Sequence, residues 1–489
     1  MRLQVLADGA ADLEMSPNDG EVEILSLTAD SRSVRAGALF AALSGSKTHG
    51  TAFIADAIAQ GAAAVLLKSG ADVRLPPSVA LLRAPEPRQA FARLAARFWG
   101  RQPSTVIAIT GTSGKTSVAE FARQIFHALG HRAASLGTLG IVTASATRYG
   151  ALTTPDPVSL HQTLAQLAEE GITHLAMEAS SHGLDQYRLD GIALSAAAFT
   201  NLGRDHLDYH PSEAAYLKAK LRLLTELLPE AGTAVVAADA THAPSALAAA
   251  RAAGRKVFTV GKAAGSTLQL EAQHPVGFGQ QLRVRHGAGA CDLTLPLIGD
   301  YQASNALVAA ALVMATGEPA EPTLAALEQL RGVKGRLEIV GQARGGLIVV
   351  DYAHKPDALA AALQALKPFA AGRIVCVFGC GGDRDKGKRP IMGRIASELA
   401  GSVIITDDNP RSEPAAAIRA EILAGAPAAR EIGDRAEAIK AGVRLLGSGD
   451  VLLIAGKGHE TGQIIGSTTV PFSDHEAVRA ALAEAPLNA

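Results

Sequence analysis

The chain has 489 residues, of which 48% are hydrophobic and 19% charged, and its formal net charge is −1. Because one hydrophobic core stops growing well below this length, we expect about two to four domains of an ordinary globular protein. The near-zero charge excludes a broad electrostatic surface for nucleic acid or anionic lipid. No apolar run reaches the ~20 residues that span a bilayer, no signal peptide opens the chain, and cysteines are few, which favours a cytoplasmic protein.

Residues 1–103 are the first predicted domain, a small α/β unit without a phosphate loop. The run ALFAAL predicts a strand, and GSKTHGTAFIADAIAQ predicts a loop and a helix. The polar turns of this domain offer a ligand rim, although an ordinary turn is the simpler interpretation of each residue taken alone. The rim candidates are Ser31, Arg32, Ser46, Lys47 and Thr48.

The stretch VIAITGTSGKTSVAEFARQIFHAL, residues 106–129, opens a second predicted domain, residues 104–333. An apolar, β-branched run of strand length precedes GTSGKTS, and apolar residues at helical spacing follow. In such a unit the loop amides and the helix dipole bind phosphate, Lys115 reaches the β- and γ-phosphates, and the Thr116 hydroxyl suits Mg²⁺. Ile109 stands where the usual pattern has its first glycine, so the loop is a shortened variant. A chance glycine turn is the alternative.

Further strand-like runs, at 174–180, 196–202 and 234–239, alternate with helical segments. This order predicts a mostly parallel sheet with helices on both faces and ligands at the carboxyl ends of the strands. Glu178 and His206 follow two of these runs, and a carboxylate with an imidazole can hold Mg²⁺ beside phosphate. The alternatives are a helix-cap contact for Glu178, a core position for His206 and, for Lys220, the surface position usual for lysine.

Residues 334–489 are the third predicted domain. It contains four apolar runs that each end in a polar or glycine-rich turn: LIVVDYAH, RIVCVFGC, SVIITDDN and DVLLIAGKGHE. This pattern is typical of a doubly wound α/β domain. The segment GCGGDRDKGKRP fits either an anion-binding loop or a solvated charged turn. Arg411 follows a rigid Asn-Pro pair, and its guanidinium can clamp a carboxylate through two hydrogen bonds.

Together these motifs resemble the Mur ligases, the ATP-dependent enzymes that build the peptide of bacterial cell-wall precursors. The resemblance covers nearly the whole chain. It rests on ADSRSV, GTSGKTS, TTPDP, MEASSHGLDQYR, FTNLGRDHLDYH, YLKAK, LIGDYQASNALVAAA, GRLE, DYAHKPDAL, VFGCGGDRDKGKRP, DDNPR and GKGHE. Ser113 and Ser117 stand where the family often has Asn and Thr, and Leu152 stands where a polar residue is common.

The resemblance implies roles for individual residues. The nucleotide would be held by Gly111, Thr112, Ser113, Gly114, Lys115, Thr116, Ser117, Asn305, Arg336, Asp351 and His354. The UDP-linked substrate would be held by Ala29, Ser31, Ser46, Lys47, Thr48, Thr153, Thr154, Ser180, Gln186 and Arg188. The incoming amino acid would be held by Arg389, Asp408, Asn409, Pro410, Arg411, Gly456 and Glu460. Mg²⁺ would be held by Thr116, Glu178, His206 and Lys220, the last as a carbamate, and the catalytic residues would be Lys115, Lys220, Glu178 and His206.

The implied reaction adds meso-2,6-diaminopimelate to the D-glutamate of UDP-N-acetylmuramoyl-L-alanyl-D-glutamate, in cytoplasmic peptidoglycan precursor synthesis. ATP converts the carboxylate into an acyl phosphate, which the amine then attacks. The expected cofactors are ATP and Mg²⁺, the expected partners are these small molecules alone, and the expected state is a monomer. The DNPR motif favours diaminopimelate over lysine, because a buried Arg411 without a second carboxylate would remain unpaired. Alternatives are a lysine-adding relative, a folylpolyglutamate synthetase and a nucleotide-dependent switch protein.

Overall fold

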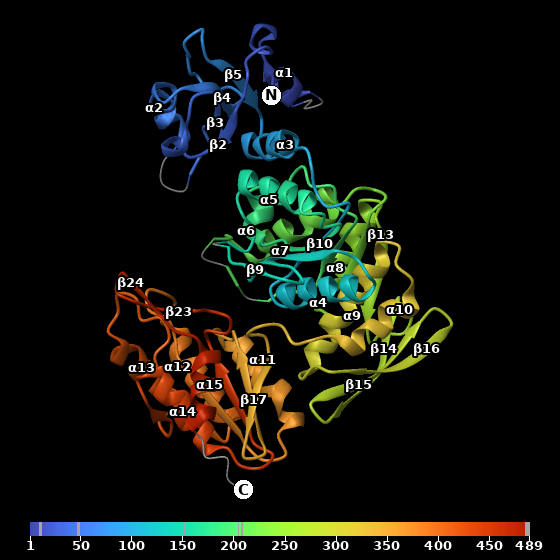
Figure 1. Ribbon diagram of the computed structural model, residues 1–489, viewed down its shortest axis with the longest axis vertical. Helices are drawn as coiled ribbons and strands as arrows, with labels where there is room; N and C mark the ends of the chain where they lie inside the picture. The colour runs from blue at the N-terminus through green and yellow to red at the C-terminus, as the bar shows by residue number, and fades with distance from the viewer. Residues whose placement is uncertain (9–11, 46–48, 151, 204, 207–208, 485–489) are drawn as a thin grey trace. The chain divides into compact units, whose positions relative to one another are not determined.

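The computed structural model describes residues 1–8, 12–45, 49–150, 152–203, 205–206 and 209–484 (Figure 1). Three of the predicted rim residues, Ser46, Lys47 and Thr48, therefore lie outside the described residues. The chain divides into two compact units, one formed by residues 1–268 with 308–323 and the other by residues 269–307 with 324–489.

The N-terminal part of the first unit is a five-stranded sheet in the order β1-β5-β4-β3-β2, parallel except for β1. Its elements are α1 (Leu3–Ala7), β1 (Glu14–Met15), β2 (Ser26–Thr28), β3 (Ala38–Ala41), α2 (Ile54–Ala59), β4 (Ala62–Lys68), β5 (Ala80–Ala84) and α3 (Pro87–Trp99). Alternate strand residues face opposite layers: Leu39 and Leu66 pack with Phe91 of α3, whereas Phe40 and Val65 pack with Ile54 of α2. The predicted α/β fold of this part is confirmed.

The central part of this unit is a mostly parallel sheet in the order β13-β12-β11-β6-β10-β7-β8-β9, in which β8 alone runs in the opposite direction and pairs antiparallel with β7 and β9. Its strands are β6 (Thr105–Thr110), β7 (Ala133–Gly137), β8 (Gly140–Val142), β9 (Thr147–Arg148), β10 (His174–Glu178), β11 (Ala196–Phe199), β12 (Thr233–Ala237) and β13 (Lys256–Gly261). Its helices are α4 (Lys115–Ala128), α5 (Pro157–Glu169), α6 (Ser181–Asp185), α7 (Glu213–Arg222) and α8 (Ala243–Ala252).

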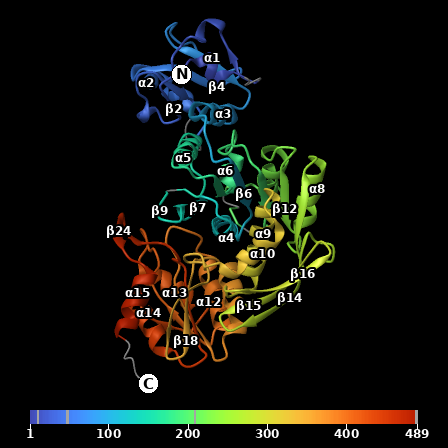
Figure 2. The same cartoon turned by 45° about the vertical axis from the view of Figure 1, so that its right-hand side comes forward.

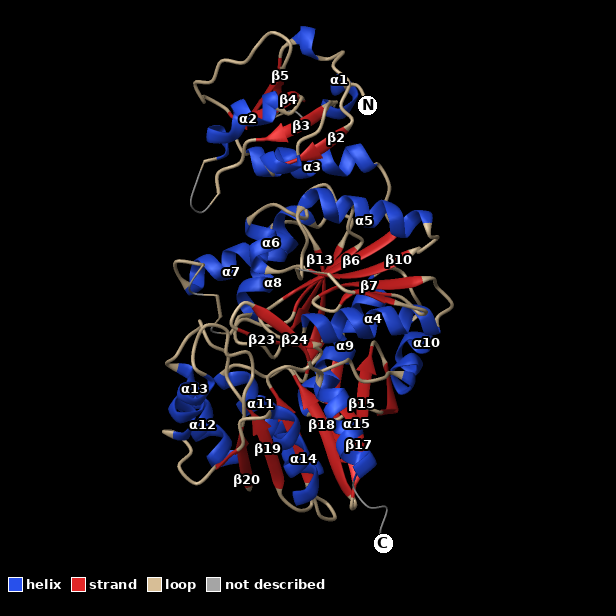
Figure 3. Ribbon diagram, turned by 60° about the vertical axis from the view of Figure 1, so that its left-hand side comes forward, coloured by secondary structure: helices blue, strands red, loops and turns tan. Residues whose placement is uncertain are grey.

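Helices cover both faces of this central sheet. Figure 3 shows strands β6, β7 and β10 between α5 and α4. Val106 and Ala108 of β6 share a buried core with Leu160 and Leu164 of α5. Strand β6 lies between β10 and β11, and neither of these follows it directly in the chain. This reversal of strand order opens a crevice at the carboxyl end of β6, where ligands bind in such folds.

The second unit begins within β14 (Leu268–Val276) and continues with β15 (Gly279–His286) and β16 (Gly289–Leu295). The next helices, α9 (Asp300–Ala315) and α10 (Ala320–Ala325), are divided between the units, because residues 308–323 belong to the first. Strands β15 and β16 form an antiparallel hairpin. The sequence predicts β segments between 267 and 297 and a helix after them, and both are present.

The C-terminal sheet has the order β17-β18-β22-β19-β20-β21, parallel except for β17. Its strands are β17 (Glu338–Ala343), β18 (Gly346–Asp351), β19 (Ile374–Phe378), β20 (Ser402–Ile405), β21 (Arg430–Glu431) and β22 (Val451–Ala455), and a hairpin, β23 (Gly462–Ile465) and β24 (Thr468–Pro471), follows. The helices are α11 (Pro356–Leu366), α12 (Lys388–Leu399), α13 (Ala415–Leu423), α14 (Arg435–Leu445) and α15 (Asp474–Glu484).

This sheet is doubly wound, as predicted. Val349 and Cys376 pack in one buried layer with α11, α12 and α13, and Val350 and Val377 pack in another with α14 and α15. Figure 2 shows α14 and α15 side by side. All four apolar runs of the predicted third domain are strands. Among the described residues, none of the helices has the length and apolarity needed to cross a membrane.

Candidate active site

The predicted phosphate loop connects β6 to α4. Gly111 has φ 153° and Gly114 has φ 86°, values that glycine adopts without strain, and α4 begins at Lys115. A Cβ on Gly111 would lie 1.9 Å from Thr200 Oγ1, so a side chain does not fit there. Thr116 and Ser117 lie buried in the first turn of the helix. The loop therefore presents backbone amides at the N-terminus of a fourteen-residue helix, which is an anion-binding arrangement.

Residues after β11 hold this loop in place. The amide of Ser113 donates to Asn201 Oδ1 at 2.9 Å, and Thr200 Oγ1 donates to the carbonyl of Ser113 at 2.7 Å. The amide of Thr112 donates to the carbonyl of Asn201 at 3.0 Å. Ser113 thus fits the loop through its main chain, which explains why serine serves where the family often has asparagine.

Two lysines converge on this loop. Nζ of Lys115 donates to the carbonyls of Gly111, at 2.8 Å, and Thr112, at 3.0 Å. Nζ of Lys220, from α7, donates to the same Gly111 carbonyl at 2.7 Å. The Lys220 residue is 1% exposed and its ammonium lies 4.5 Å from the ring centroid of Tyr216. The interpretation of Lys220 as a surface lysine is therefore wrong, and the side chain points to the phosphate loop.

Glu178 ends β10, the neighbour of β6, and is 2% exposed. Its Oε1 accepts the amide of Thr138 at 2.7 Å and its Oε2 accepts the Thr138 hydroxyl at 3.2 Å. A Cβ on Gly137 would lie 2.2 Å from Glu178 Oε1, so glycine makes room for the carboxylate. These contacts fix the carboxylate in one position, and they do not include the helix-cap contact considered as an alternative.

His206 lies beyond β11 with φ 52°, and its side chain is 42% exposed, so it is not a core histidine. Its ring centroid lies 6.1 Å from that of Tyr216, the residue that also contacts Lys220. The Tyr216 hydroxyl lies 3.1 Å from Thr112 Oγ1 in the phosphate loop. A carboxylate, a hydroxyl and an imidazole beside a phosphate loop fit Mg²⁺, which binds few protein ligands and keeps several waters. Carbamylation of Lys220 would add a further oxygen donor.

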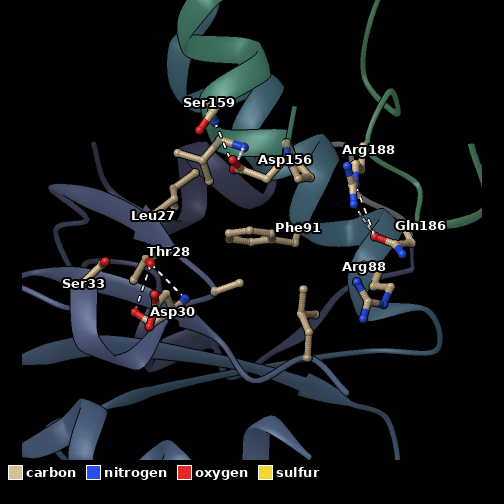
Figure 4. Close-up of a pocket in the computed structure, with 14 residues that line it drawn as sticks. Leu27, Thr28, Asp30, Ser33, Arg88, Phe91, Asp156, Ser159, Gln186 and Arg188 are labelled. Atoms are coloured by element: carbon tan, nitrogen blue, oxygen red, sulfur yellow. Dashed lines mark hydrogen bonds between the residues drawn. The ribbon is translucent and has the colours of Figure 1, made fainter. Parts of the chain in front are cut away.

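A cavity of about 480 Å³ lies between the N-terminal and central parts of the first unit (Figure 4). Figure 4 shows Arg88, Arg188 and Gln186 at one end of it and Thr28 and Asp30 at the other. Ala29, Gln186 and Arg188, three of the predicted UDP-substrate residues, line it. Ser31 does not line it; Ser31 begins a short 3-10 turn (Ser31–Ser33) capped by Asp30.

The remaining predicted substrate residues form a hydrogen-bonded chain from this cavity to Glu178. Arg188 Nη1 donates to the carbonyl of Thr154 at 2.7 Å, and Thr154 Oγ1 donates to the carbonyl of Glu178 at 3.0 Å. The amide of Ser180 donates to Thr154 Oγ1 at 3.1 Å. The hydroxyls of Thr153 and Thr138 lie 3.1 Å apart. The structure thus brings the predicted cavity residues and the predicted metal ligand into one network.

The predicted amino-acid residues of the second unit meet at the carboxyl ends of β20 and β22. Asn409 Nδ2 donates to Glu460 Oε2 at 3.0 Å, and Asp408 lies beside Gly456, whose φ is 115°. Lys457, which the sequence did not single out, is 0% exposed and ties them together. Its Nζ lies 3.0 Å from Asn409 Oδ1, 3.0 Å from Glu460 Oε2 and 3.6 Å from Asp408 Oδ1. Its position in the GKGHE motif, between Gly456 and Glu460, is the sequence feature that could have identified it.

Burial raises the pKa of Asp408, and the nearby Arg435 and Lys457 counteract this rise. Arg435 is itself fully buried and forms an ion pair with Asp474 at 2.7 Å. Its Nη2 also donates to the carbonyl of Ala455 at 3.0 Å. These buried cations keep the loops after β20 and β22 in register around Asp408.

Arg411 and Arg389 have different surroundings. Arg411 has φ 52°, and its amide and carbonyl bond to the β-hairpin, to Ile464 at 3.0 Å and to Gly466 at 2.7 Å. Its Nη1 donates to the carbonyl of Gly382 at 2.9 Å. Arg389 is 0% exposed, and its guanidinium bonds to Glu413 at 2.9 and 3.0 Å and to Glu421 at 2.9 Å. The backbone of Pro410, next to Arg411, packs against Gly382.

The predicted nucleotide residues of the second unit also lie near one another. Asp351 is 7% exposed and accepts the amides of Leu337 and Ala353, both at 2.7 Å. The Arg336 guanidinium lies 4.7 Å from the ring centroid of Tyr352. Burial lowers the pKa of His354 to about 4, so its imidazole is neutral at pH 7. Asn305 donates to Gln302 Oε1 at 3.0 Å, and Gln302 donates to the Arg336 carbonyl at 3.1 Å.

Three family models match the chain in order. The Mur ligase family catalytic domain matches residues 23–99, the Mur ligase middle domain residues 109–313, and the Mur ligase glutamate ligase domain residues 335–458.

Individual relatives agree with these models. The chain is 56% identical to the UDP-N-acetylmuramoyl-L-alanyl-D-glutamate–2,6-diaminopimelate ligase of Bradyrhizobium diazoefficiens, over 99% of both chains. A solved structure of a protein with the same name has 31% identity and a TM-score of 0.74, and covers 99% of both chains. The MurF ligase of Thermotoga maritima, solved in complex with ADP, has the same fold with 20% identity and a TM-score of 0.61, over 90% of this chain and 94% of that one. The chain therefore belongs to the Mur ligase family.

Proposed function

We propose that the chain joins meso-2,6-diaminopimelate to the D-glutamate of UDP-N-acetylmuramoyl-L-alanyl-D-glutamate, using ATP, as a cytoplasmic enzyme of peptidoglycan precursor synthesis. The relative from Bradyrhizobium, at 56% identity, carries a name with this substrate and this amino acid. The family models support a division into domains at residues 1–103, 104–333 and 334–489. Each boundary falls in an irregular segment, after α3 and before β17 respectively.

The observation that carries the proposal is the convergence of Lys115 and Lys220 on the Gly111 carbonyl. An acyl phosphate forms when the substrate carboxylate attacks the γ-phosphorus of ATP, the P–O bond to ADP breaks and ADP leaves. Both reactants are anions, so positioning and neutralisation of charge are the main contributions of the enzyme. Lys115 supplies one fixed positive charge at the loop. The diaminopimelate amine then attacks the acyl carbon, and phosphate leaves.

The two lysine nitrogens lie less than about 6 Å apart, because each is within 2.8 Å of the same oxygen. Two ammonium groups at this separation repel by a few kcal/mol at an effective dielectric constant of ~20. Carbamylation of Lys220 removes this repulsion by turning one ammonium into an anion. Mg²⁺, when bound by Thr116, Glu178, His206 and that carbamate, would supply charge neutralisation of the transferred phosphoryl group.

The cavity in Figure 4 supports binding of the UDP-linked substrate. The guanidinium groups of Arg88 and Arg188 lie at one end of it, where a diphosphate fits, and Phe91 offers an apolar face. Thr154 links Arg188 to Glu178, so the muramoyl dipeptide would extend from the cavity toward the phosphate loop. Ser31 and residues 46–48 remain proposed contacts for the uridine.

A coupled phosphate-release assay tests the proposal, with the UDP-muramoyl dipeptide and ATP present and either diaminopimelate or lysine added. We expect phosphate release with formation of the tripeptide only when diaminopimelate is present. Release with lysine alone would identify the lysine-adding activity instead. ATP hydrolysis without an amide product would reject the ligase and favour the switch protein, and turnover of a pteroate substrate would favour the folylpolyglutamate synthetase.

The Lys220 modification is tested separately by peptide mass spectrometry in bicarbonate buffer and by activity after bicarbonate is removed. We expect a mass increase on the Lys220 peptide and a loss of activity that added bicarbonate restores. If activity is indifferent both to bicarbonate and to Lys220→Ala, Lys220 is not a metal ligand.

A further inference from the structure

A cluster of metal-ligating side chains lies at the opposite end of the central sheet from the phosphate loop. Among the described residues, His131, His174 and Glu318 offer three ligand atoms that all lie within 4.8 Å of one another. His131 follows α4, His174 is the first residue of β10, and Glu318 lies between α9 and α10. His174 pairs in register with Thr105, the first residue of β6. The cluster is therefore about 13 Å along the strand from Glu178 and has no part in the phosphoryl chemistry.

We propose that His131, His174 and Glu318 form a binding site for a divalent transition metal of the zinc class. Two imidazoles with one carboxylate are a ligand set that suits Zn²⁺, whereas Mg²⁺ and Ca²⁺ prefer oxygen ligands. His131 Nε2 and Glu318 Oε1 are already 2.8 Å apart. The ring centroids of His131 and His174 are 3.9 Å apart.

The Nδ1 side of the His174 ring has a hydrogen-bond partner, the hydroxyl of Thr173. The Thr173 hydroxyl donates its proton to the carbonyl of Arg132, at 3.3 Å. The same oxygen lies 2.9 Å from His174 Nδ1. In the tautomer whose Nδ1 donates to this hydroxyl oxygen, Nε2 is the nitrogen that can bind a metal. A hydrogen bond on the ring nitrogen that does not bind the metal is the usual support of a metal-binding histidine.

The site is also accessible to solvent, and its three ligand atoms lie near the separations that a bound zinc ion requires. The side chains of His131 and Glu318 are 29% and 21% exposed, so water can supply a fourth ligand. A tetrahedral zinc with bonds of about 2.0–2.1 Å separates its ligand atoms by about 3.3 Å. The ligand atoms here lie within 4.8 Å of one another, so side-chain rotations would have to shorten these separations by about 1.5 Å or less. Such a metal would link the loop after α4, the start of β10 and the turn after α9, which are distant in sequence.

Zinc titration of the full-length, metal-stripped protein against a chromophoric chelator tests the site, in excess Mg²⁺ to occupy oxygen-rich sites. We expect each of His131→Gln, His174→Gln and Glu318→Gln to weaken binding of one zinc ion by about 10-fold or more. The matched control is His475→Gln. It removes a histidine whose Nε2 lies 2.6 Å from a carboxylate, that of Glu338, but which is not part of the group of His131, His174 and Glu318. It should bind zinc as the wild type does.

Zinc should also raise the thermal unfolding midpoint of the wild type and of the control, but not of the three ligand variants. Glu318→Gln retains an acceptor for His131 and so preserves the metal-free fold. A wild type that takes up no zinc, or ligand variants that bind zinc as tightly as the wild type, would overturn the proposal. Neither readout depends on ligase activity, so the result is independent of the proposed function.

Discussion

Lys457 is the residue whose replacement most directly tests the amino-acid site. Its ammonium, 0% exposed, contacts Asn409, Glu460 and Asp408 at 3.0, 3.0 and 3.6 Å. Lys457→Met retains most of the volume of the side chain and removes the charge. Asn409 and Glu460 then lose the group that aligns them, and Asp408 loses one of the two cations that counteract its burial.

The size of the effect follows from these distances. At an effective dielectric constant of ~20, opposite charges 3.6 Å apart attract by about 4–5 kcal/mol. Removal of one partner from a buried ion pair costs about 3–5 kcal/mol in measured cases. If only a third of that falls on ligand binding, the KM for diaminopimelate rises about 10-fold, since ~1.4 kcal/mol corresponds to a factor of ten. The KM for ATP should change by less than about 3-fold, because the Lys457 ammonium bonds to Asn409, Glu460 and Asp408, which are all predicted amino-acid residues.

Steady-state phosphate release, measured separately against diaminopimelate and ATP, provides the test. The matched control is Lys440→Met on α14, which removes a lysine that pairs with Glu484 at the surface and should leave both KM values unchanged. Circular dichroism and the thermal midpoint establish that the variant is folded. A folded Lys457→Met protein whose KM for diaminopimelate stays within about 2-fold of the wild type would refute this reasoning.

Three further predictions follow from the site. Gly137→Ala should displace the Glu178 carboxylate, 2.2 Å from the new Cβ, and lower kcat about 100-fold, which the Mg²⁺ dependence of turnover will report; unchanged turnover would contradict it. Arg389 lowers the pKa of Glu413 to about 2, so this pair adds stability above pH 4.5 that is lost as the pH falls toward 2. Denaturant unfolding between pH 2 and 7 should show that the free energy of unfolding falls less steeply with acid in Glu413→Gln than in the wild type. Identical pH curves would show that the Arg389–Glu413 pair does not contribute to stability. Arg411→Ala should reduce diaminopimelate turnover far more than ATP affinity, and equal turnover in both proteins would rule out its role.

The sequence by itself determined the elements and the family. The apolar periods placed the strand before the phosphate loop, the helix after it and all four long runs of the C-terminal sheet, because strand and helix periods are local properties. The motifs GTSGKTS, YLKAK and DDNPR, with their order, indicated the Mur ligase family. Ser113, an unusual residue for this loop, does not change the prediction, because its main-chain amide and carbonyl form the hydrogen bonds that hold the loop.

Only the tertiary structure decided which side chains meet. Lys220 lies 109 residues from Gly111, and residue by residue it could be taken for a surface lysine, yet it is buried against the phosphate loop. The reason is the strand order, which places β10 and β11 on either side of β6 and so joins segments that no local pattern connects. Lys457 and the cluster of His131, His174 and Glu318 were likewise recognised only from the tertiary structure. Burial and pairing across a sheet are long-range consequences of the fold, and the local periods that specify each strand do not contain them.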